Sequence, residues 1–269
     1  MKETNLLPVL AECANRLGSV VQSIESALSK PIITDVSGQR QYRYEQHTPY
    51  HIAFLKGVRI VSGLSACLFL LKEKGGFAQE VMVIVRTLDD FTGEMMFILE
   101  NAESDRLTNH QEKFLKDFFQ EEFVNPNNPL LNEARRDTVP KKNVWASVAR
   151  QIAPYANQSD LQKMLQVTND ALSGYAHGAY PHIMEMFCGR PAHFHFEGMS
   201  GTTRIPMCIQ QLEIYTHRAI MAFNLLAKNL GLAALSEFLL ETRDYLEKEV
   251  GYVQPGDLNK DIRSLKKRR

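Results

Sequence analysis

The stretch that decides the fold runs from residue 77 to residue 100 and reads FAQEVMVIVRTLDDFTGEMMFILE. Its apolar residues recur at alternating spacings of four and three, which is the spacing of one face of an α-helix. This stripe consists of Phe77, Val81, Ile84, Leu88, Phe91, Met95 and Ile98. Further apolar residues occupy most of the remaining helix surface, a pattern typical of a helix buried among several others. We therefore expect this segment to be the central helix of the protein.

Four charged residues, Arg86, Asp89, Asp90 and Glu94, interrupt this apolar helix. Arg86, Asp90 and Glu94 are each four residues apart and therefore share one face. A charge in such surroundings must be paired or used, because burying an isolated ion is costly. One interpretation is an ion-pair ladder that determines how the helix packs. The other is a pocket in which Arg86 binds an anionic group such as phosphate, while Asp90 and Glu94 ligate a metal or act as an acid–base pair.

The composition restricts the class of protein. The 31 Lys and Arg residues balance the 31 Asp and Glu residues of this 269-residue chain, so any nucleic-acid binding would have to be local. The four cysteines form no C-x-x-C pair, which argues against a zinc ribbon and favours a reducing cytoplasm. The chain begins without a signal-peptide pattern, and its most apolar run, residues 58–71, is shorter than the roughly 20 residues that cross a bilayer. We expect a cytoplasmic protein with no membrane partner.

The rest of the chain shows the same helical periodicity. It predicts helices over about residues 6–28, 50–74, 107–123, 142–153, 158–180, 206–230 and 232–250, with a short one after Pro181. Residues 32–49 are predicted to be a connector that could hold a short extended piece, and residues 188–204 a loop or brief strand. The expected fold is all-α, a helical bundle of about eight or nine helices.

The segment VNPNNP, residues 124–129, is the sharpest loop signal in the chain. It divides a single helical domain into two possible subdomains, residues 1–123 and 130–250. Residues 251–269 form a tail that ends in four basic residues, which is either a solvated end or a contact for nucleic acid or a partner protein. Residues 205–230 carry apolar groups on more than one side, so we also expect a homodimer.

A cluster of histidines suggests a metal site. Ser173 and His177 are one helical turn apart, and His182 and Glu185 have the i, i+3 spacing that is found in helical di-metal proteins. Asp90 and Glu94 would supply the remaining ligands of a divalent metal. Helical di-iron proteins usually carry two carboxylate-x-x-His units, whereas this chain has one pair in the reverse order.

The segment from Arg190 to His195 resembles the active-site motif of the HEPN superfamily of ribonucleases, in which an arginine is separated by four residues from a histidine. The resemblance implies a helical dimer that cleaves RNA, with Arg190 stabilising charge on the phosphate and His195 acting as acid or base. Pro191 and the nearby glycines favour a loop, whereas that superfamily carries the motif on a helix.

A second resemblance joins two motifs, V-R-T-L-D-D at residues 85–90 and L-S-G-Y-A-H at residues 172–177. Together they resemble a widespread prokaryotic helical family of unknown function, which has an arginine and then an acidic residue on one helix and a serine and then a histidine on another. The family usually has glutamate where this chain has two aspartates. The resemblance implies an all-α fold, functional roles for Arg86, Asp90, Ser173 and His177, and a place among mobile or defence-related genes.

These observations lead to three functional hypotheses. The first is one polar pocket of Arg86, Asp90, Glu94 and His177 that binds RNA or a nucleotide, with His177 as general acid or base in a ribonuclease. The second is a non-catalytic regulatory or protein-interaction module, in which the same residues form a buried packing network. The third is a helical di-metal hydrolase or oxidase.

Overall fold

The computed structural model describes residues 6–36, 38–72, 75–102, 106–121, 128, 138–152 and 157–251. Within these ranges it contains nine helices and two short antiparallel hairpins, which confirms the all-α prediction. The elements are α1 (Leu7–Ala27), β1 (Ile32–Val36), β2 (Gln39–Arg43), α2 (Pro49–Lys72), α3 (Ala78–Leu99), α4 (Asn109–Phe118), α5 (Lys141–Ile152), α6 (Gln158–Ala176), α7 (Tyr180–Met184), β3 (Phe187–Cys188), β4 (His193–Phe194), α8 (Arg204–Asn229) and α9 (Ala233–Val250). Apart from Asn128, the predicted VNPNNP boundary lies outside the described residues, as does the basic tail from residue 252 onward.

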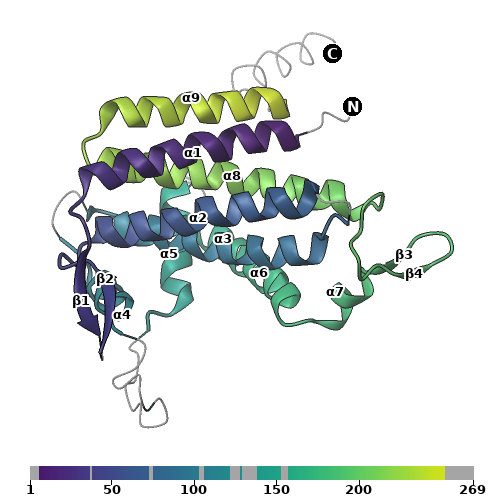
Figure 1. The fold of residues 1–269 in the computed structure, drawn as a ribbon, viewed down its shortest axis with the longest axis horizontal. Coiled ribbons are helices and arrows are strands. Elements are labelled where there is room, and N and C mark those ends of the chain that lie inside the picture. Colours follow the sequence, from purple (N-terminus) through teal and green to yellow (C-terminus); the bar gives the residue numbers. More distant parts are fainter. Residues whose placement is uncertain are drawn as a thin grey trace.

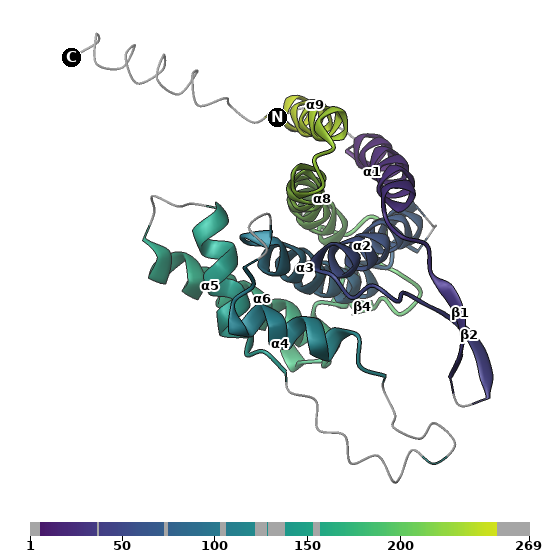
Figure 2. The same cartoon turned by 90° about the vertical axis from the view of Figure 1, so that its left-hand side faces the viewer.

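The helices form layers around α3. In Figure 2, α1 and α9 lie on one side, α8, α2 and α3 occupy the middle, and α4, α5 and α6 lie on the other side. The central helix α3 packs against α2, α8, α6, α5 and α4, as its apolar surface predicts. The two hairpins lie at opposite ends of the long axis (Figure 1).

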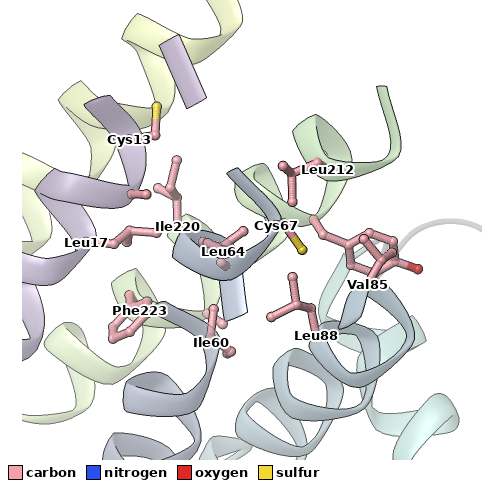
Figure 3. Close-up of a cluster of buried hydrophobic side chains, with 14 of the residues drawn as sticks. Cys13, Leu17, Ile60, Leu64, Cys67, Val85, Leu88, Leu212, Ile220 and Phe223 are labelled. Carbon is pink, nitrogen blue, oxygen red and sulfur yellow. The ribbon is translucent and has the colours of Figure 1, made fainter. Parts of the chain in front are cut away.

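The main hydrophobic core lies between α1, α2, α3 and α8. Figure 3 shows Leu17 of α1, Leu64 of α2, Leu88 of α3 and Phe223 of α8 converging in this core. Each of these side chains is at most 1% exposed, and burying one such side chain is worth about 1.5–3 kcal/mol. Gly57 lets α2 and α8 approach closely, because a Cβ at this position would lie 2.8 Å from the Phe223 ring.

This core draws on both parts of the chain that were predicted as subdomains. The C-terminal helices α8 and α9 both pack against α1, and α8 also packs against α2 and α3. A smaller cluster joins Phe97 of α3 to Val148 of α5 and Leu165 of α6. Residues 1–123 and 130–250 therefore do not have separate cores, because helices from both ranges pack against each other in the main core.

The apolar residues of α8 are mostly covered within the chain. Leu212, Ile220 and Phe223 are completely buried in the main core. The homodimer was expected because α8 carries apolar groups on more than one side. Most of these groups are covered by α1, α2, α3 and α9 of the same chain. The homodimer itself stays a prediction.

The structure refines one expectation about the first third of the chain and corrects another. The predicted connector holds the extended piece that was allowed for, as the antiparallel hairpin β1–β2, in which Ile33 pairs with Tyr42. The apolar run of residues 58–71 was expected to be too short to cross a bilayer. It belongs to the 24-residue helix α2, which by length and composition alone is long and apolar enough to cross one. Among the described helices it is the only such candidate, and it packs against α1, α3 and α8 as a core helix does.

The turn before α3 anchors a distant loop. Met199 N donates to Gly76 O at 2.9 Å, and Ser200 N donates to Gly75 O at 2.8 Å. Gly198, with φ of +108°, leaves no room for a side chain, because a Cβ there would overlap the Gly75 backbone. These contacts hold the segment that connects β4 to α8 against the start of α3.

Candidate functional site

The charged face of α3 forms the predicted intrahelical pair. Arg86 Nη1 lies 2.5 Å from Asp90 Oδ2, in an ion pair rather than a directed hydrogen bond. Lys141 of α5 approaches the same carboxylate, with its Nζ 3.0 Å from Asp90 Oδ1. Arg86 is therefore already paired with an anion of its own helix, in the position where a phosphate clamp was expected.

Asp89 is the more deeply buried of the two aspartates, at 7% exposed. Its Oδ1 accepts a hydrogen bond from Arg218 Nη1 of α8 at 2.6 Å, and its Oδ2 accepts one from Asn169 Nδ2 of α6 at 2.9 Å. The same Asn169 amide lies 3.3 Å from Asp90 Oδ1. Burial raises the pKa of the neighbouring Tyr215 phenol, and the charge of Asp89 raises it further. This cluster joins α3 to α6 and α8.

Glu94 belongs to a separate pair with α2. Its Oε2 lies 2.5 Å from Lys56 Nζ, and that ammonium also lies over the rings of Phe91 and Phe118, at 4.7 and 5.2 Å from their centroids. The ion pair and the two cation–π contacts hold Lys56 in place. Glu94 therefore ties α3 to α2, whereas Asp90 ties α3 to α5.

The space beside these charges is small. A cavity of about 20 Å³ touches Asp89, Asp90, Glu94 and Arg218, which is room for about one water molecule. A nucleotide does not fit in that volume. The arrangement corresponds to the ion-pair network that determines packing, one of the two interpretations of this face.

His177 does not join the α3 charges. Helix α6 runs antiparallel to α3, with Asn169 beside Asp89 and with Tyr175 lining a cavity near Gln79. His177 is exposed and caps the C-terminus of α6, eight residues and about 12 Å along the axis beyond Asn169. Ser173 is half-buried one turn before it. The prediction of one pocket containing Arg86, Asp90, Glu94 and His177 is wrong in this respect, because the direction of α6 carries His177 away.

The four predicted metal ligands also separate into two places. His182 and Glu185 lie near Gln79, which precedes Asp90 by eleven residues, or about 16 Å along α3. Asp90 and Glu94 have lysine or arginine partners instead. Nowhere in the described part of the chain do three His, Cys, Asp or Glu side chains come together as a metal site would require.

Arg190 and His195 lie on the β3–β4 hairpin, as the prediction of a loop or brief strand at this segment allowed. Arg190 is exposed in the turn, and His195 Nε2 lies 3.2 Å from Cys188 O. The His193 and His195 rings lie 4.2 Å apart. These residues are on the surface and not on a helix, which departs from the placement that the HEPN resemblance implied.

A cavity lies between α3, α6 and α8, and His182 of α7 lines one end of it. Its volume is about 370 Å³. Apolar side chains cover most of its wall, and they are Ala78, Met82, Val167, Ala171, Leu172 and Met207. Pockets that bind small molecules are typically of this size and lined in this way.

Glu185 organises the polar end of this cavity. Its Oε2 accepts hydrogen bonds from Tyr175 Oη at 3.0 Å and from Gln79 Nε2 at 3.4 Å. Its Oε1 lies 3.2 Å from Arg204 Nη1 and 3.7 Å from His182 Nδ1. The carboxylate is thus surrounded by donors from α3, α6, α7 and α8, and it holds these four elements together at one point.

The protonation of this end follows from burial. Burial raises the pKa of the Tyr175 phenol, and the hydrogen bond to Glu185 raises it further. Burial, followed by the charge of Glu185, raises the pKa of the Cys208 thiol to about 11. At neutral pH both groups keep their protons, so the cavity offers no phenolate or thiolate nucleophile at these two positions.

Sequence reasoning named His182 and Glu185 but missed Gln79, Tyr175 and Arg204. One signal was present, because Gly174 interrupts a helix at a cost of about 1 kcal/mol relative to alanine and so requires a packing reason. That reason is the His182 ring, which occupies the place of the missing side chain and stacks on Tyr175 with ring centroids 3.9 Å apart.

Comparison of the chain with protein families, curated proteins and solved structures finds no match. The two motif resemblances therefore stay expectations.

Proposed function

We propose that this chain is a non-catalytic helical module that binds a small, largely apolar molecule in the cavity between α3, α6 and α8. The observation that carries the proposal is the shape of this cavity, about 370 Å³ of mostly apolar wall with one polar end. This is a specific form of the regulatory-module hypothesis.

The hydrogen bonding of the polar end indicates the chemistry of the ligand. Glu185 already accepts from Tyr175 and Gln79 and is paired with Arg204. What remains for a ligand is the rest of the Arg204 guanidinium, which can only donate, and the amides of Gln210 and Gln211, which can both donate and accept. The ligand end that faces the Arg204 guanidinium is a hydrogen-bond acceptor, such as a carbonyl, carboxylate or sulfonate group.

The protonation states favour binding over nucleophilic catalysis. Tyr175 and Cys208 are held in their neutral forms by burial, and Glu185 is engaged by its neighbours. We place the module in the cytoplasm, which is supported by the four free cysteines of the chain.

The ribonuclease hypothesis stays a prediction, but its candidate site moves from α3 to the β3–β4 hairpin. Arg86 is paired with Asp90, so of the predicted residues the exposed Arg190 and the half-buried His195 are the pair with suitable chemistry. Incubating labelled RNA with the parent protein and with His195→Ala, each with and without EDTA, tests it. Cleavage that survives EDTA and disappears in the variant would favour a metal-free ribonuclease over the binding module.

Binding in the cavity is tested with 1-anilinonaphthalene-8-sulfonate, an apolar fluorophore with a sulfonate acceptor. We expect saturable fluorescence enhancement with the parent and an affinity about tenfold lower in Ala171→Phe, whose ring fills the cavity. The matched control is Ala176→Phe on the same helix, which is exposed and outside the cavity lining. Equal affinity of both variants for the fluorophore, with unchanged circular dichroism, would contradict the proposal.

A second pair of probes tests the polar end. Arg204→Gln is expected to weaken binding of the sulfonate probe while leaving its uncharged relative N-phenyl-1-naphthylamine unaffected, because only the sulfonate needs the guanidinium. An equal loss of affinity for both probes would show that Arg204 maintains the shape of the cavity and does not bind the sulfonate group.

A further inference from the structure

Helices α3 and α8 run parallel, so their N-terminal ends lie side by side at the polar end of the cavity. Near the start of both helices Cys208 Sγ donates to Ala78 O at 3.5 Å, and further along both Arg218 Nη1 donates to Asp89 Oδ1 at 2.6 Å. Figure 2 shows the two helices next to each other. Each helix N-terminus carries a partial positive charge of about half a unit. Together with the Arg204 guanidinium, these charges favour an anionic group at this end of the cavity.

The His182 ring is fixed at the same end with one nitrogen unsatisfied. Its Nδ1 is buried and makes no hydrogen bond with the part of the chain that the structure describes, since Glu185 Oε1 lies 3.7 Å away. The ring stacks on Tyr175 with centroids 3.9 Å apart and fills the space over Gly174, where a Cβ would lie 2.4 Å from it. A buried nitrogen without a partner costs about 1–3 kcal/mol. Protonation of the ring would offset this cost, because the neighbouring carboxylate attracts an imidazolium.

Glu185 offers one negative charge to two basic groups. Its Oε1 faces Arg204 Nη1 at 3.2 Å as well as His182 Nδ1. While His182 is neutral, Glu185 balances the charge of Arg204. When His182 is protonated, the two cations exceed the carboxylate by one charge. An anionic head group beside Arg204 restores the balance, so the binding of an anion and the binding of a proton favour each other.

We propose that the cavity binds an anionic amphiphile together with one proton, which His182 takes up. The preferred ligand is thus a carboxylate or a sulfonate with an apolar body, and not a neutral carbonyl compound. Binding tightens as the pH falls and weakens as it rises, because histidine changes its charge between about pH 5 and pH 8. This inference rests on the proposed function, since it specifies the ligand and the regulation of the same cavity.

The other titratable groups that line the cavity keep their charge over this range. Burial raises the pKa of the Cys208 thiol to about 11, and burial together with the hydrogen bond to Glu185 raises the pKa of the Tyr175 phenol. Arg204 stays protonated, and carboxyl groups ordinarily titrate near about pH 4. Helix α3 contributes no titratable side chain to the lining. Among the lining residues, His182 is therefore the group whose charge changes near neutral pH.

The test is fluorescence titration of the full chain with two probes, 1-anilinonaphthalene-8-sulfonate and its uncharged relative N-phenyl-1-naphthylamine. Both titrations run from about pH 5.5 to about pH 8 at constant ionic strength, a range over which the sulfonate keeps its charge. We expect the affinity for the sulfonate to fall about tenfold from the acidic to the basic end of this range. The affinity for the uncharged probe is expected to stay constant, because that probe has no charge to couple to the proton. Circular dichroism at each pH checks that the chain stays folded.

Two substitutions of His182 remove the titrating group. His182→Gln keeps a neutral polar side chain, whereas His182→Phe keeps a ring that can stack on Tyr175. In both variants we expect an affinity for the sulfonate that no longer changes with pH. The matched control is His177→Gln, which removes an exposed histidine outside the cavity lining and is expected to keep the pH dependence of the parent.

Isothermal titration calorimetry measures the proton directly and needs no variant. Heats of sulfonate binding near neutral pH, compared between buffers of different ionisation enthalpy, give the number of protons that the complex takes up. We expect the parent to take up a measurable fraction of one proton with the sulfonate and none with the uncharged probe.

The outcomes separate this inference from the proposed function. Saturable sulfonate binding without proton uptake, or a pH dependence that survives in both His182 variants, overturns the proton coupling and leaves the binding module intact. A pH dependence that the uncharged probe shares overturns it as well, because the shape of the cavity and not its charge would then change with pH. If neither probe binds saturably at any pH, the proposed function and this inference are both wrong.

Discussion

Asp89 shows how far a single charged residue can be interpreted from sequence. Its place in an apolar helix predicts that it needs a partner, and the i, i+4 spacing correctly pairs Arg86 with Asp90. The partner of Asp89 is Arg218, which lies 129 residues later in the chain. No local pattern identifies such a partner, because only the crossing of α3 and α8 brings the two side chains together.

The first prediction concerns this pair. Asp89→Asn removes the negative charge while Arg218 stays 18% exposed beside it, so we expect the free energy of unfolding to fall by about 3 kcal/mol. Urea denaturation followed by circular dichroism measures the change.

The control for this prediction is Asp244→Asn. Asp244 pairs with Arg243 on the surface of α9 and is 62% exposed, so its loss is expected to change the stability by less than about 0.5 kcal/mol. Equal effects of the two substitutions would mean that the α3 charges are solvated in solution and do not form a buried network.

At the scale of elements, the junction of α3 and α4 depends on Gln111. Its Nε2 donates to Phe97 O at 2.8 Å and to Glu100 O at 2.7 Å, which satisfies carbonyls at the end of α3. Its Oε1 accepts from Thr108 N at 2.9 Å and completes the capping box of α4. One buried side chain thus ends one helix and begins the next.

The second prediction follows from this double role. Gln111→Leu removes the side-chain hydrogen bonds to Phe97 O, Glu100 O and Thr108 N, and we expect a loss of about 3 kcal/mol in the free energy of unfolding. The same substitution at the exposed Gln22 of α1 is expected to stay within about 0.5 kcal/mol. Thermal and urea unfolding of both variants provide the comparison, and a stable Gln111→Leu protein would contradict the prediction.

At the scale of the whole molecule, α3 belongs to both hydrophobic clusters. Val85 and Leu88 lie in the main core, and Phe97 lies in the smaller cluster with α5 and α6. A helix shared in this way couples the two clusters, because neither keeps its packing if α3 unfolds. We therefore expect one cooperative transition for the described helices.

The third prediction uses Trp145, the single tryptophan, which packs on the smaller cluster. Urea unfolding followed by its fluorescence is expected to coincide with unfolding followed by far-ultraviolet circular dichroism, which reports all helices. If the fluorescence transition came first, α5 and α6 would be an independent unit, and the subdomain boundary predicted from the sequence would regain support.

By itself the sequence determined the helical class, the approximate helix positions, the burial of α3 and the pairing of Arg86 with Asp90. These properties follow from a period of 3.6 residues and from contacts one turn apart, which are local. The tertiary structure decided that Asp89 meets Arg218, that the direction of α6 takes His177 away from α3, and that Gln79, Tyr175 and Arg204 surround Glu185. Helix order, direction and crossing determine such contacts, and residue spacing along one helix carries no information about them.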